Sequence, residues 1–109
     1  MIEEKRKTHR LRVNIEAVCQ EGGRFFKAYV LDISLGGLKM ESQTKIENGD
    51  KLKITLEWKN PLKLEGTVRW SQKDGLHYIY GVQFTNLNEE QDAGIRGITQ
   101  DVFWKNYGG

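Results

Sequence analysis

Short runs of alternating apolar and polar residues, separated by turn-forming residues, are the feature that most constrains the fold of this chain. In the clearest run, 51–58, every second residue is apolar: Leu52, Ile54, Leu56 and Trp58. A strand with one buried face has this period of two, because successive side chains point to opposite faces. The run therefore predicts a strand that packs one side on a core.

Five further runs read as strands, at 13–19, 24–33, 38–41, 62–70 and 77–84. Turn-forming residues separate them, including the segment QEGG at 20–23, a loop that closes with Asn-Gly-Asp at 48–50 and the pair Asp74-Gly75. Six short strands in so short a chain favour a closed antiparallel β-barrel, since closure leaves no exposed edge. In the run 62–70, the period of two places four residues inward: Leu62, Leu64, Val68 and Trp70.

The periodicity changes from strand to helix at Asn88. Asn88 and Gln91 have the spacing of an N-cap and its capping-box partner. Ile95, Ile98 and Val102 then recur at helical spacing, so we expect a helix that covers one mouth of the barrel. The predicted organisation is a basic arm at 1–12, a barrel at 13–87 and a helix at 88–107, an all-β fold with one C-terminal helix.

Composition limits the chain to one soluble domain. It has 109 residues, of which 38% are hydrophobic, and no apolar run long enough to span a membrane, so we expect a cytoplasmic protein. Cys19 is the only cysteine and falls in an alternating run, which predicts a buried structural thiol. Because no catalytic motif or metal-ligand spacing accompanies the two histidines, we expect neither an enzyme nor a metal or other cofactor.

Two clusters carry chemistry. The first is RKTHR, with Arg6 and Arg10 in a basic arm that holds five basic and two acidic residues at positions 1–12. An arginine can engage a phosphate or the O6/N7 edge of guanine with two parallel hydrogen bonds. On charge alone, a solvated tail that keeps the protein in solution remains an alternative.

The second cluster is DISLGG, at the end of the run 24–33. Asp32 can accept hydrogen bonds from the N1–H and N2–H₂ groups of guanine, and Ser34 can add a donor or acceptor. Gly36 and Gly37 let the backbone approach a base or phosphate closely and permit positive φ. Taken alone, the cluster is also typical of a strand-end turn whose polar side chains bond to local backbone and whose glycines form a bulge.

With both motifs in this order, the chain resembles the PilZ domain, a bacterial receptor module for cyclic di-GMP. The RxxxR pattern is present at 6–10 and DxSxxG at 32–37, and the segments VRW (68–70) and YGVQF (80–84) also resemble strands of the family. The likeness covers about residues 5–87. It implies a six-stranded barrel of PilZ type whose outer surface receives the nucleotide beneath the arm.

The resemblance also implies roles for individual residues. Arg6 and Arg10 would hold guanine edges and phosphates, Asp32 and Ser34 would read a guanine, and Gly36 and Gly37 would permit close packing. Lys5, just before the first motif arginine, is compatible with a stacked pair of ligands. Lys7 and His9 are candidates for additional contacts.

A ligand-ordered arm would then present a new surface to a protein partner in motility, adhesion or secretion machinery. Two other functions remain open. One is a degenerate PilZ-like module that binds only a protein. The other is a barrel that binds single-stranded nucleic acid; this requires exposed aromatic side chains, whereas the pattern assigns most aromatics to the core.

Overall fold

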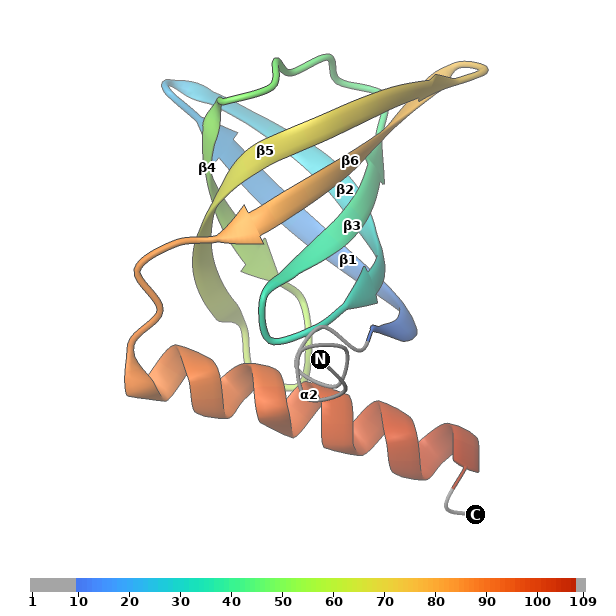
Figure 1. Cartoon of the computed structure of the whole chain (residues 1–109), viewed down its shortest axis with the longest axis vertical. Coiled ribbons are helices and arrows are strands. Elements are labelled where there is room, and N and C mark those ends of the chain that lie inside the picture. Colours follow the sequence, from blue (N-terminus) through green and yellow to red (C-terminus); the bar gives the residue numbers. More distant parts are fainter. Residues whose placement is uncertain (1–9, 108–109) are drawn as a thin grey trace, which may run out of the picture.

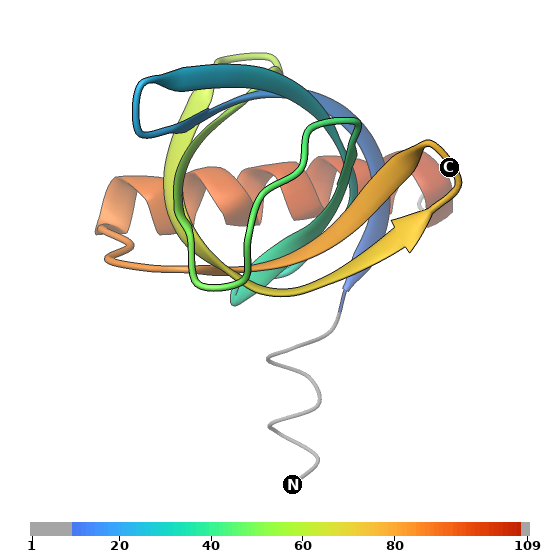
Figure 2. The same ribbon diagram turned by 90° about the horizontal axis from the view of Figure 1, so that it is seen from above.

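The computed structural model describes residues 10–107, in which six antiparallel strands close into a barrel in the order β1-β2-β3-β6-β5-β4 (Figures 1 and 2). The strands are β1 (Leu11–Glu21), β2 (Arg24–Ile33), β3 (Gly37–Ser42), β4 (Lys51–Leu56), β5 (Leu62–Asp74) and β6 (His77–Phe84). The barrel predicted from the alternating runs is confirmed. β1 begins two residues earlier than the sequence indicated, so Arg12 is part of the barrel wall.

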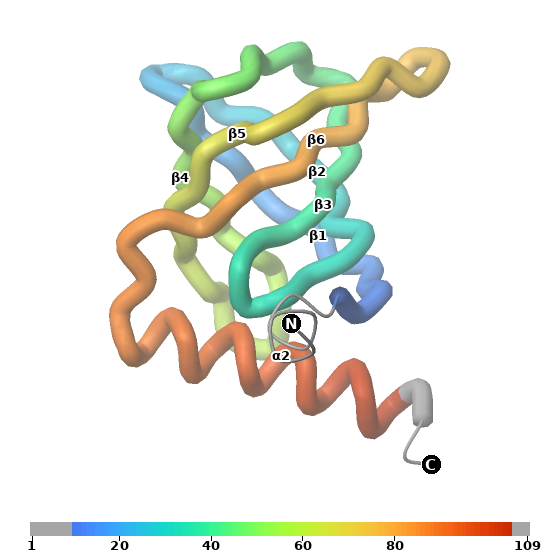
Figure 3. The backbone as a smooth tube through the Cα atoms, in the orientation of Figure 1, coloured from blue at the N-terminus to red at the C-terminus, as the bar shows by residue number. Residues whose placement is uncertain are grey.

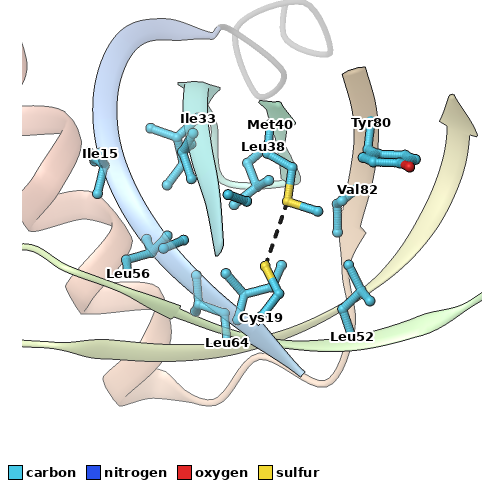
Figure 4. Packing of buried hydrophobic residues seen from close by; sticks show 14 of the residues in the cluster. Ile15, Cys19, Ile33, Leu38, Met40, Leu52, Leu56, Leu64, Tyr80 and Val82 are labelled. Atoms are coloured by element: carbon cyan, nitrogen blue, oxygen red, sulfur yellow. Dashed lines mark hydrogen bonds between the residues drawn. The ribbon is translucent and has the colours of Figure 1, made fainter. Parts of the chain in front are cut away.

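The inward residues of the alternating runs form a continuous apolar core (Figure 4). Ile54 and Leu56 of β4 are fully buried, as is Cys19 of β1. The Cys19 thiol points at the sulfur of Met40, at an Sγ–Sδ distance of 3.9 Å, and burial raises its pKa to about 12. Cys19 is therefore an inert packing residue, as the sequence predicted.

Tyr80 of β6 binds the β3–β4 loop to the barrel through two hydrogen bonds. Its hydroxyl donates to the carbonyl of Thr44 (2.8 Å) and accepts from the N–H of Ile46 (2.9 Å). Burial is the main reason why the pKa of Tyr80 is raised. A phenol that is both donor and acceptor inside the core removes the cost of burying its oxygen.

The helix α2 (Glu89–Tyr107) lies across one end of the barrel (Figures 1 and 2). The Gln91 N–H donates to Asn88 Oδ1 (2.7 Å) and the Asn88 N–H donates to Gln91 Oε1 (3.0 Å), which confirms the capping box. Ile95, Ile98 and Val102 are buried as predicted. Within residues 10–107, no helix combines the length and apolar character that crossing a membrane would require.

The β5–β6 hairpin extends beyond the barrel wall and turns at Gly75, which has φ of 64° (Figure 3). The predicted Asp74-Gly75 turn is thus confirmed, since glycine adopts this left-handed conformation without strain. Leu76 at the tip is highly exposed.

β-Bulges interrupt three strand pairs and change which residues face outward. The register shifts between Arg12 and Ile15 in β1, between Val30 and Asp32 in β2, and between Val68 and Trp70 in β5. A bulge places an extra residue on one strand, so the inward–outward alternation reverses beyond it.

The bulge in β5 overturns one sequence prediction. Val68 is buried opposite Val82, but two residues later Trp70 pairs with Gly81 and is 42% exposed. Strict alternation had placed Trp70 in the core. The prediction was wrong because the extra residue, Arg69, moves Trp70 to the outer face.

Other aromatic residues are also more exposed than the pattern indicated. The exposed ones within residues 10–105 are Phe25, Tyr29, Trp70, Phe103 and Trp104. Trp58 lies beyond the end of β4 and is only partly buried. The expectation that most aromatics lie in the core was therefore wrong for half of the described aromatic residues. These exposed residues occupy outward positions on strands or the end of α2.

Candidate functional site

A row of five cross-strand neighbours runs over the outer face of the barrel. Arg12 of β1 pairs with Asp32 of β2, Asp32 pairs with Lys39 of β3, Lys39 with Gly81 of β6, and Gly81 with Trp70 of β5. Directly paired residues share a face of the sheet. The row therefore gathers two cations, a carboxylate and an indole on one surface.

Asp32 owes its place in this row to the bulge in β2. Phe26, Ala28 and Val30 face inward at alternate positions, and continued alternation would send Asp32 into the core. After the register shift it is Ile33 that is buried, opposite Leu38, while Asp32 lies opposite Lys39. The bulge thus removes an ionised carboxylate from the apolar interior, where its burial would be costly.

Two cations hold the Asp32 carboxylate. Arg10 Nη1 donates to Oδ1 at 2.9 Å, and Lys39 Nζ lies 3.5 Å from Oδ2. The Asp32 side chain is 12% exposed, compared with 46% for Arg10 and 41% for Lys39. The structure therefore brings Arg10 of the RxxxR motif onto the first residue of the DxSxxG motif.

Ser34 is engaged by its own turn. The residue is buried; its hydroxyl donates to the carbonyl of Gly37 (3.3 Å) and accepts from the N–H of Gly36 (3.2 Å). Its main-chain N–H also donates to the Gly37 carbonyl (2.9 Å). In this conformation Ser34 shapes the β2–β3 turn, which is the local alternative that the sequence left open. Its contact with a ligand stays a prediction.

The two motif glycines have different surroundings. A Cβ on Gly37 would overlap the carbonyl oxygen of Val82 on β6, so the missing side chain permits close packing of β3 on β6. A Cβ on Gly36 would meet only Ser34 Oγ, at 4.0 Å, which leaves its outer side open. Neither glycine has positive φ, so the conformational freedom expected from the sequence is not used.

The Trp70 side chain lies so close to Gly81 that a Cβ there would overlap the indole ring. The glycine thus makes room for the ring on the barrel wall, on the same cross-strand row as Asp32. An exposed indole beside cationic groups can stack on a nucleobase.

Sequence reasoning missed Lys39 and Trp70. Lys39 follows Gly37 by two residues, so the period of a strand would have placed Lys39 on the same face as Gly37. In the structure Lys39 lies opposite Asp32. For Trp70 the alternation predicted an inward side chain, and no local feature of the sequence marks the bulge that turns it outward. The remaining predicted residues, Lys5, Arg6, Lys7 and His9, lie outside the described residues.

Two further observations concern other parts of the described surface. A hollow of about 580 Å³ is lined partly by β4 and β5, with Lys53 and Glu65 among its residues, and contains none of the predicted ligand residues. Residues 10–107 hold no group of three or more His, Cys, Asp or Glu side chains arranged to bind a metal ion.

Comparison with known proteins points to one family. The model of the PilZ domain matches residues 4–101. No match was found among curated protein sequences.

Solved structures share the fold at low sequence identity. The PilZ domain of YcgR from Escherichia coli, solved with c-di-GMP, has a TM-score of 0.79 and 12% identity, over 90% of this chain and 91% of that one. MrkH of K. pneumonia in its apo state has a TM-score of 0.77 and 18% identity, and the match covers 90% of this chain and 51% of MrkH. The PilZ domain of CeSA from a cellulose-synthesizing bacterium has a TM-score of 0.64 and 17% identity, and the match covers 92% of this chain and 100% of that domain. With the family model spanning nearly all of the barrel and helix, the chain belongs to the PilZ domain family.

Proposed function

We propose that this domain is a receptor for cyclic di-GMP, which binds on the outer face of the barrel around Asp32. The observation that carries the proposal is the 2.9 Å contact between Arg10 and Asp32, because it joins two motifs that are 22 residues apart in the chain. Membership of the PilZ family supports the ligand class, and the intact motif residues support retention of binding.

The chemistry of the described residues suits a guanine nucleotide. The Asp32 carboxylate can accept from the N1–H and N2–H₂ of one guanine. Arg10 offers a planar fork for the O6/N7 edge or for a phosphate, and Arg6 would supply a second fork from the arm. Gly36 leaves its side of the turn open to the ligand, and the indole of Trp70 offers a surface for base stacking.

Binding exchanges one set of contacts for another. Arg10 is half exposed and its ion pair with Asp32 is screened by water, so the pair is worth about 1 kcal/mol or less. A ligand that gives Arg10 a phosphate and Asp32 a guanine edge can replace that pair with several charge-assisted hydrogen bonds. The domain therefore acts as a ligand-operated switch and not as a catalyst, and its protein partner would recognise the covered surface.

Calorimetric titration of the purified chain with cyclic di-GMP, cyclic di-AMP and GTP tests the proposal. We expect saturable binding of cyclic di-GMP alone, with a stoichiometry that distinguishes one ligand from a stacked pair. Arg10→Ala and Asp32→Ala should lose most of the affinity. Arg24→Ala is the matched control, because Arg24 pairs with Glu21 at the β1–β2 turn. If the parent does not bind, the function is wrong; if both site variants bind like the parent, the site is wrong.

One observation favours a second candidate, a PilZ domain that binds only a protein. Ser34 is buried in its own turn and Asp32 is already paired with two cations, so the polar groups of both side chains have partners within the protein. Thermal unfolding separates the two functions. Cyclic di-GMP at 100 times its Kd would stabilise a receptor by about 2.7 kcal/mol, whereas the protein-binding module would melt at an unchanged temperature.

The exposed aromatics keep a third candidate, single-stranded nucleic acid binding, open to test. Phe25 and Tyr29 lie on the outer face of β2, where bases could stack. A gel shift with random oligonucleotides decides it: retardation that Phe25→Ala abolishes would establish this function.

A further inference from the structure

The two cations on Asp32 come from different parts of the fold. Arg10 directly precedes β1, which begins at Leu11, and pairs with Oδ1. Lys39 lies inside β3, with Asp32 opposite on β2 and Gly81 opposite on β6, and approaches Oδ2. Arg10 can therefore move without disturbing the barrel, whereas the backbone of Lys39 is held by hydrogen-bonded strands on both sides.

Under the proposed function, Arg10 has to leave Asp32. A guanine edge needs the carboxylate oxygens, and the ligand's phosphates attract the guanidinium. The Asp32 side chain is only 12% exposed, so loss of both cations would leave a largely desolvated charge. A cation that stays in place avoids this cost. An ionised carboxylate has about four acceptor positions, enough for one ammonium and a guanine edge together.

We propose that Lys39 is a positioning residue of the nucleotide site: it stays on Asp32 Oδ2 and fixes the carboxylate's orientation when Arg10 turns to the ligand. The inference rests on the proposed function and adds a residue outside both motifs. Lys39 acts through Asp32, so its contribution concerns the reading of guanine. A lysine that merely attracted phosphate would instead strengthen every cyclic dinucleotide equally.

The test compares two ligands on three variants. Cyclic di-IMP carries hypoxanthine, which lacks the 2-amino group that Asp32 would bind, so the parent should prefer cyclic di-GMP by about tenfold or more, as for a lost hydrogen bond to a charged group. Lys39→Gln should weaken cyclic di-GMP by about tenfold and reduce this preference. Lys39→Arg should retain most of the preference, because its charge and reach are similar. Lys53→Gln, an exposed lysine on β4, is the matched control and should bind like the parent.

A double-mutant cycle with Asp32→Asn separates the two possible roles of Lys39. If Lys39 acts through Asp32, Lys39→Gln changes affinity little once Asp32 is replaced. The inference is overturned if Lys39→Gln binds both ligands like the parent, or if it weakens both equally in either background. Melting curves without ligand confirm that each variant is folded. If the parent binds neither ligand, the proposed function itself fails, and this inference fails with it.

Discussion

The Cα of Gly37 on β3 packs directly against the main-chain carbonyl of Val82 on β6. No other residue type fits there without moving a strand, because the obstructing atom belongs to the backbone. The last glycine of the motif thus has a structural role in the barrel wall whether or not a nucleotide binds.

Gly37→Ala should lower the free energy of unfolding by about 1–3 kcal/mol, the usual cost of overpacking a close-packed site. Urea denaturation measures it. Gly36→Ala is the matched control and should stay within about 0.5 kcal/mol of the parent, because its Cβ would be 4.0 Å from the nearest atom. Equal losses in the two variants would contradict this assignment.

Under the proposed function, Trp70→Ala should weaken binding of cyclic di-GMP by about 1–3 kcal/mol, the usual contribution of one base stacked on an aromatic side chain. Trp70→Phe should retain part of the affinity. Calorimetry gives both values, and Phe25→Ala serves as a control for an exposed aromatic on the wall of β2. Undiminished affinity in Trp70→Ala would remove the indole from the site.

Stability should fall as the pH rises from about 9 towards 12. Burial raises the pKa of the Cys19 thiol to about 12, so the folded state holds this proton more tightly than the unfolded state, whose thiol titrates near pH 8.5. The stabilisation is complete below the unfolded pKa and is lost with a slope of up to about 1.4 kcal/mol per pH unit above it. Cys19→Ala should show a shallower decline in urea melts over this range. Parallel curves for parent and variant would contradict the prediction.

Asn88→Ala should cost about 1 kcal/mol, because the N–H of Gln91 loses its acceptor at the start of α2. Asn88→Asp keeps the acceptor and adds a charge that favours the helix N-terminus, so it should be at least as stable as the parent. Thermal denaturation compares the three proteins. A loss in Asn88→Asp as large as that in Asn88→Ala would mean that the cap is not what stabilises this end.

The parts of the fold that depend on local patterns could be predicted from the sequence. Alternation around Ile54 gave a strand, and the spacing of Asn88 and Gln91 gave the start of the helix, since each signal lies within a few residues. The orientation of Trp70 could not be predicted in this way. It depends on a bulge, which arises from the pairing of two strands and leaves no periodic trace in either one.

The residues of the candidate site that belong to the RxxxR and DxSxxG motifs could be identified from the sequence. Arg10 and Asp32 were both identified, and the structure places them in contact. Lys39 was missed because the reading of the motif ended at Gly37, although the strand continues. The engagement of Ser34 by its own turn was one of two alternatives that the sequence left open, and it became visible only in the three-dimensional contacts, while a contact of Ser34 with a ligand stays a prediction.

The bulges have a consequence for comparing such chains. Asp32 and Trp70 each follow an inward residue by two positions, and they lie on the outer face because the residue in between forms a bulge. Without Leu31 or Arg69, the carboxylate or the indole would directly follow Val30 or Val68, and strict alternation would still place it on the outer face. A homologue that lacks either residue could therefore keep the same outer surface, so an alignment gap at one of these two positions does not mean that the surface is lost.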